Sequence, residues 1–103
     1  GIQRVIKDTK TLKESDTDLA IVIAGREGAL PSVLASLIDI PIVAVPASSG
    51  YGFGGNGFTA LLSMLQSCSL GITVVNVDNG VGAAIFASLI CKRINELRGG
   101  GTV

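Results

Sequence analysis

Hydrophobic and polar positions alternate along this chain in blocks that predict strands and helices in turn. Three short apolar runs, at residues 19–24 (LAIVIA), 41–46 (PIVAVP) and 72–77 (ITVVNV), have the length of strands. Each run is apolar at nearly every position, which is typical of strands covered on both faces, as in a parallel sheet. Polar or glycine-rich segments follow each run. We therefore expect a three-stranded parallel sheet.

Between the strands lie stretches with helical spacing of apolar residues. The predicted helices cover residues 2–12, 31–38, 58–68 and 81–97, with Pro31 tolerated in a first helical turn. Strands that alternate with helices of this length form right-handed βαβ units and indicate the α/β class. We expect a three-layer parallel sheet of flavodoxin-like type, with three strands and four helices. The domain spans residues 1–98, and residues 99–103 form a flexible glycine-rich tail.

In such sheets, ligands bind beyond the carboxyl ends of the strands. Three loops leave the predicted strands there, at residues 25–28, 47–57 and 76–80. The middle loop, ASSGYGFGGNG, is rich in glycine, which suits a backbone that turns sharply and presents N–H groups to a phosphate. The polar and glycine residues predicted to bind the ligand are Gly25, Arg26, Gly28, Ser48, Ser49, Gly50, Tyr51, Gly52, Asn76, Asp78 and Asn79.

The glycine loop has three interpretations. Residues 50–55 match the GxGxxG pattern, and Asp78 ends the next strand about 20 residues later, where a ribose-binding acid would lie. However, residues 47–49 separate this pattern from its strand, and an earlier βα unit precedes it. The loop therefore either follows the dinucleotide-binding pattern, binds a nucleotide in another geometry, or is merely flexible.

The amino-acid composition excludes several classes of protein and several types of catalytic site. The chain has 103 residues, 48% of them hydrophobic, a formal net charge of zero and no histidine. Zero net charge and few aromatic residues argue against nucleic-acid binding, and no run is long enough to span a membrane. We expect a cytoplasmic protein, and its high apolar content predicts a homo-oligomer. Without histidine, this chain supplies neither a histidine general base nor a Ser-His-Asp triad.

Glu27 and Cys68 are the candidate catalytic residues. Glu27 follows the first strand, where it could act as an acid or base or simply favour the next helix dipole. Cys68 comes at a helix end and is either a nucleophile or a small buried hydrophobic residue. Cys91 is predicted to lie in the core. Asp78 or Asn79 is expected to contact ligand or to cap the last helix.

Four ordered motifs carry a family resemblance: AGREGALPSVLA at residues 24–35, VPASSGYGFGG at 45–55, ALLSMLQSCSLG at 60–71 and VVNVDNGVGAA at 74–84. Together they closely resemble the catalytic domain of the LarB family, the pyridinium biscarboxylate mononucleotide synthases of nickel-pincer nucleotide biosynthesis. That domain is related to the aminoimidazole ribonucleotide carboxylases and mutases of PurE type. The family's domain opens with a strand and a phosphate-binding loop, so the first strand–helix–strand is expected to be missing here.

The resemblance implies carboxylation of nicotinic acid adenine dinucleotide with CO2 or bicarbonate, and hydrolysis of its phosphoanhydride to AMP. Cys68 matches the cysteine that adds to the pyridinium ring, and Glu27 matches the proton acceptor. No tightly bound cofactor is expected; Mg2+ could assist hydrolysis, held by Asp78 or Glu27. The purine mutase is the alternative activity, but its histidine is matched by Ala29. A nucleotide-binding regulator and an inactive fragment also remain open.

Overall fold

The computed structural model describes residues 17–25, 29–48, 57–67 and 70–100. Its three strands are β1 (Ala20–Ala24), β2 (Ile42–Pro46) and β3 (Ile72–Val74), all parallel in the order β1-β2-β3. The helices are α2 (Leu30–Leu37), α3 (Phe58–Leu65) and α4 (Gly80–Asn95), followed by a wider helical turn, η2 (Glu96–Gly100). The α/β class and the parallel sheet are confirmed.

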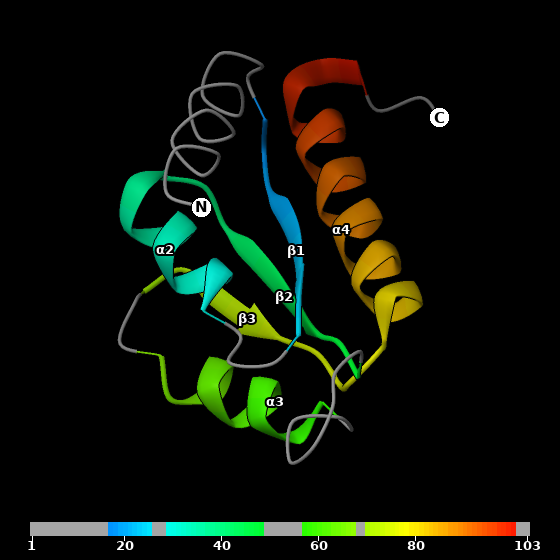
Figure 1. The fold of residues 1–103 in the computed structure, drawn as a ribbon. Coiled ribbons are helices and arrows are strands. Elements are labelled where there is room, and N and C mark those ends of the chain that lie inside the picture. The colour runs from blue at the N-terminus through cyan, green and yellow to red at the C-terminus, as the bar shows by residue number, and fades with distance from the viewer. Residues whose placement is uncertain (1–16, 26–28, 49–56, 68–69, 101–103) are drawn as a thin grey trace.

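The sheet separates two layers of helix, with α2 and α3 on one side and α4 on the other (Figure 1). Val22 and Ile42 pack with Leu34 and Ile38 at the α2 layer. Val43 and Val45 pack with Ala83 of α4 on the opposite face. Because side chains alternate between the two faces of a strand, β2 packs against both helix layers. Every residue of this strand is buried.

The prediction that every strand is covered on both faces is wrong for β1. Val22 is buried, but Ile21 and Ile23 on the α4 face are 41% and 62% exposed. On this face, the buried cluster formed with Ala83 of α4 includes Val43 and Val45 of the neighbouring strand β2. The strand prediction at residues 19–24 is otherwise accurate to one residue.

Two predicted boundaries extend too far. Strand β3 ends at Val74 because only three of its residues pair with β2, after which the chain turns. Helix α3 ends at Leu65, before the polar pair Gln66 and Ser67. At the carboxyl end, the chain continues from α4 into η2, within which Gly99 has a non-helical φ of 85°. The predicted helix at residues 2–12 lies outside the described residues.

Cys91 is exposed on α4, so the prediction that it lies in the core is wrong. The face of α4 against the sheet instead centres on Ala83, which is fully buried. The helix is apolar all round over its first turns, so periodicity alone did not distinguish its inner from its outer face. None of the helices in the described ranges combines the length and the hydropathy needed to span a membrane.

Candidate functional site

The candidate site lies at the edge of the sheet where all three strands end. Two backbone hydrogen bonds tie the outgoing segments together there. The Ala47 N–H donates to the Ala24 carbonyl at 2.9 Å, and the Asp78 N–H donates to the Pro46 carbonyl at 2.8 Å. Each loop therefore starts against the end of the neighbouring strand, as the parallel topology predicts.

Asp78 links the last of these loops to the glycine loop. Its carboxylate Oδ1 accepts a hydrogen bond from the Ser48 N–H at 2.9 Å, although 30 residues separate the two. The side chain and the backbone of Ser48 both stabilise the ionised form, which lowers the pKa of the Asp78 carboxyl group. Asp78 also has a φ of 60°, in the left-handed region that aspartate tolerates better than most residues.

This link predicts a pH dependence of stability. Since the folded state lowers the pKa of Asp78, its contribution is complete above the pKa of the unfolded carboxyl group. It is lost as the pH falls through the lower, folded-state pKa. In urea unfolding at about pH 7 and about pH 3, wild type is expected to lose more stability on acidification than Asp78→Asn does. Equal losses would contradict a stabilising role for this carboxylate.

Gly57 fixes the far end of the glycine loop. It is buried, with a φ of +76°, and an added Cβ would lie 2.5 Å from Val77 Cγ1 and 3.3 Å from the Ala47 carbonyl oxygen. Thus both ends of the loop, Ala47–Ser48 and Gly57, lie against the turn formed by Val77 and Asp78. The structure brings together the two loops that sequence predicted to share a ligand.

Asn79 is the N-cap of α4. Its Oδ1 accepts a hydrogen bond from the Gly82 N–H at 3.0 Å, so the prediction that Asp78 or Asn79 caps this helix is confirmed for Asn79. An added Cβ at Gly82 would collide with the Asn79 side chain. The exposed Asn76 lies at the same turn, where its carbonyl accepts from the Asn79 N–H at 3.1 Å. Gly25 is half-buried directly after β1.

Two further helices begin at this edge without a side-chain cap. The N-cap residues Ala29 of α2 and Gly57 of α3 make no side-chain capping hydrogen bond, and neither helix has an acidic residue in its first turn. The first amides of a helix lack intrahelical acceptors and carry the positive end of its dipole. The edge therefore offers an anion a favourable position, above all at α3, whose first turn follows the glycine loop.

The hydroxyls of Ser32 and Ser67 lie 2.6 Å apart and join the start of α2 to the segment after α3. Ser67 directly precedes Cys68, and Ser32 belongs to the helix that begins three residues after Glu27. The structure thus brings the flanks of both predicted catalytic residues together. Outside the described residues lie Arg26, Glu27, Gly28, Ser49, Gly50, Tyr51, Gly52 and Cys68.

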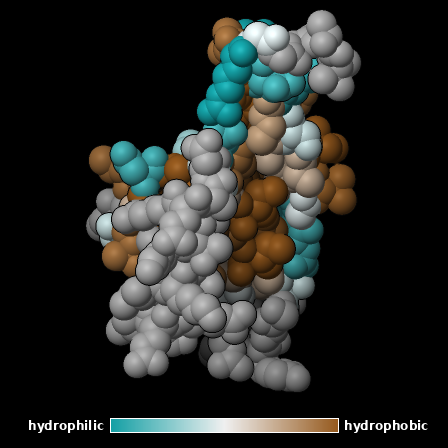
Figure 2. Space-filling view, turned by 90° about the horizontal axis from the view of Figure 1, so that it is seen from above, coloured by the Kyte–Doolittle hydropathy of each residue, from teal (hydrophilic) through white to brown (hydrophobic). Residues whose placement is uncertain are grey.

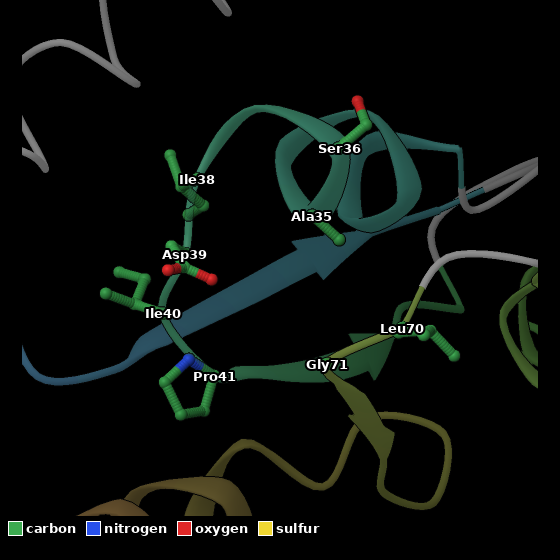
Figure 3. A pocket seen from close by; sticks show the side chains of 8 residues that line it. All are labelled: Ala35, Ser36, Ile38, Asp39, Ile40, Pro41, Leu70 and Gly71. Atoms are coloured by element: carbon green, nitrogen blue, oxygen red, sulfur yellow. The ribbon is translucent and has the colours of Figure 1, made fainter.

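A cavity of about 560 Å³ lies at the opposite edge of the sheet, where the strands begin (Figure 3). Its lining runs from the end of α2 through Ile38, Asp39 and Ile40 to Leu70 and Gly71. Asp39 supplies its charge, and none of the predicted site residues lines it. Across the described ranges, no three Asp, Glu, Cys or His side chains gather as a metal cluster.

Comparison with known proteins places this arrangement in a family. The AIR carboxylase family matches residues 2–98. An uncharacterised protein of Methanocaldococcus jannaschii is 54% identical over 93% of this chain, which corresponds to 36% of that protein. The N5-carboxyaminoimidazole ribonucleotide mutase of the same organism is 39% identical over 74% of this chain and 46% of its own length. The corresponding mutase of Pyrococcus horikoshii is 36% identical over 73% of this chain and 42% of its own.

The chain spans less than half the length of these relatives. The family match nevertheless covers nearly every residue and includes all three strands and the loops at their carboxyl ends. The parallel β1-β2-β3 sheet, with helices between its strands, agrees with a domain of PurE type. On this evidence, the chain belongs to the AIR carboxylase family.

Proposed function

We propose that this domain carboxylates the pyridinium ring of nicotinic acid adenine dinucleotide, with Cys68 as nucleophile and Glu27 as base. The observation that carries the proposal is the contact between the Ser32 and Ser67 hydroxyls, which are 2.6 Å apart. This contact holds the residue before Cys68 against the helix that follows the Glu27 loop. A thiol nucleophile and a carboxylate base are the pair that covalent catalysis without histidine requires.

The chemistry follows from the electron demand of the ring. A pyridinium carbon is too electron-poor to attack CO2, so the Cys68 thiolate first adds to the ring and forms a C–S bond. The ring is then a neutral dienamine, and one of its carbons attacks CO2 to form the new carboxylate. Glu27 accepts the proton from that carbon, and the electron pair released expels the thiolate and restores aromaticity.

The described part of the site suits the phosphates of such a substrate. The uncapped start of α3 and the glycine loop before it would bind an anion through backbone N–H groups. Asp78 holds the start of that loop in place through Ser48. If Mg2+ assists hydrolysis of the phosphoanhydride to AMP, the exposed Asp78 carboxylate and the substrate phosphates are its natural ligands, since Mg2+ prefers one or two carboxylates together with phosphates.

The alternative activity is that of the named relatives, the N5-carboxyaminoimidazole ribonucleotide mutases. Against it, this chain has no histidine, and Ala29 occupies the position that matches a histidine in those enzymes. In addition, M. jannaschii has a separate mutase, and this chain is more similar to that organism's other protein, at 54% against 39% identity. The missing histidine is the observation that argues against the mutase reaction in this chain.

A paired assay distinguishes the two activities. The chain is supplied with nicotinic acid adenine dinucleotide, bicarbonate and Mg2+ in one reaction, and with N5-carboxyaminoimidazole ribonucleotide in another. We expect AMP and a carboxylated product in the first reaction and no conversion in the second. Conversion of the ribonucleotide alone would overturn the proposal in favour of the mutase. Binding of the dinucleotide without turnover would instead indicate a regulatory relative.

A further inference from the structure

The outer side of α4 carries a ridge of exposed apolar side chains. Ala83, on the inner side of this helix, is fully buried in the cluster with β2. Val81, Ile85 and Leu89 follow one another at intervals of four residues, so they lie along one row of the helix surface, with Phe86 beside them. Their exposed fractions are 74%, 58%, 58% and 46%, in that order. Figure 2 shows hydrophobic side chains in the open on the side of the molecule where α4 lies in Figure 1.

A cleft of about 220 Å³ opens beside this ridge, between α4 and the sheet. Phe86 and Ile90 line it on the helix, and Val43 and Thr73 line it on β2 and β3. The described residues that line the cleft carry no charge. Since a cavity of about 150 Å³ holds a benzene molecule, the cleft has room for an apolar side chain. One surface thus combines a projection with a recess, which suits a symmetric interface, because such an interface uses the same surface twice.

The charges at the two ends of α4 indicate which partner the ridge contacts. Residues 79–91 carry no charge, whereas Asp78 directly precedes this stretch and Lys92 and Arg93 directly follow it. All three charged residues are exposed, and the Arg93 side chain is 75% exposed although Glu96 lies 3.6 Å away. A second copy in antiparallel orientation brings the acidic end of each helix to the basic end of the other. A parallel orientation would bring like charges together, which is unfavourable.

We propose that α4 packs antiparallel against α4 of a second copy, about a two-fold axis between Ile85 and Phe86. This axis lies midway between Asp78 and Arg93, so Arg93 of each copy lies level with Asp78 of the other. The apolar ridge of each helix packs into the groove beside the ridge of the other, as rows four residues apart do in helix pairs. The contact removes from water the apolar surface that each copy leaves exposed alone.

Sedimentation equilibrium tests this interface. The wild-type chain is expected to have at least twice its 10.4 kDa mass, and Leu89→Lys at most half of the wild-type value, because the variant places a charge in the apolar contact. Leu89 is largely exposed, so the fold should persist, which circular dichroism would verify. The matched control is Leu65→Lys on α3, 62% exposed in the other helix layer, which should keep the wild-type mass. A monomeric wild type, or a Leu89→Lys variant with the wild-type mass, would overturn the proposal.

Disulfide trapping tests the antiparallel orientation. In a background with Cys68→Ser and Cys91→Ser, Ile85→Cys places two thiols beside the two-fold axis, within disulfide reach. Lys92 lies about two turns later on the same face of α4, so the thiols of Lys92→Cys would be about 20 Å apart, well beyond that reach. Mild oxidation should therefore give covalent dimer with Ile85→Cys and little with Lys92→Cys. In a parallel pair both positions would meet their equivalents, so equal yields from the two variants would contradict the proposed orientation.

Discussion

Replacing Cys68 with alanine is expected to lower the carboxylation rate by at least about a thousandfold while leaving dinucleotide binding nearly intact. Without the thiolate, the pyridinium ring keeps its positive charge and has no carbon able to attack CO2. Binding should persist because, in the proposed site, the phosphates would contact backbone N–H groups at the start of α3 and not the thiol. Turnover and equilibrium binding of nicotinic acid adenine dinucleotide would be measured on the same preparation.

Two variants serve as comparisons for Cys68→Ala. Cys91→Ala removes the other cysteine, which is exposed on α4, and should leave turnover unchanged. Glu27→Gln removes the proposed base and should also slow carboxylation, but with the cysteine still able to add to the ring. If Cys68→Ala retained turnover close to that of Cys91→Ala, Cys68 would not be the nucleophile, and the proposed mechanism would be wrong.

Replacing Gly57 with alanine is expected to destabilise the domain by roughly 2–4 kcal/mol, the sum of two separate costs. Its φ of +76° lies in the left-handed region, which a residue with a Cβ adopts unfavourably. The new methyl group would also lie 2.5 Å from Val77 Cγ1 in a buried position, so the turn that carries Asp78 would have to shift. Urea unfolding monitored by circular dichroism gives the difference in free energy.

Two other glycines separate these costs. Gly71→Ala shares the positive φ, at +89°, but meets nothing within 4 Å, so a loss of about 1–2 kcal/mol is expected. Gly80→Ala has neither a positive φ nor a contact and should change stability by less than about 0.5 kcal/mol. Equal losses for Gly57→Ala and Gly71→Ala would show that the contact with Val77 contributes nothing.

The three parallel strands and the edge at which their loops begin could be predicted from the sequence because they depend on local patterns. The run at residues 41–46 is apolar throughout, and β2 is buried throughout. Ser48 and Asp78 lie at the same edge of the sheet because parallel strands end together. The exposure of β1 could not be predicted from the sequence pattern, because Ile21 and Ile23 are as apolar as Val22. Which of these side chains is exposed depends on where the helices pack against the strand.

Within the site, local interactions were predictable and distant ones were not. The cap of α4 is an interaction across three residues, so residue type and position predicted Asp78 or Asn79, and the structure shows Asn79. The Asp78–Ser48 and Ser32–Ser67 contacts join residues 30 and 35 positions apart, and no spacing rule connects them. The polar residues that follow the strands in the sequence indicated the sheet edge at which a site would lie. They did not indicate which of these residues contact one another.

Isotope labelling would show whether this domain carboxylates a pyridinium nucleotide. The chain is incubated with nicotinic acid adenine dinucleotide, Mg2+ and 13C-labelled bicarbonate, and the products are analysed by mass spectrometry. We expect AMP and a pyridinium mononucleotide that carries one labelled carboxylate, with no labelled product from Cys68→Ala. Unlabelled dinucleotide recovered intact from a preparation that binds it would contradict the claim.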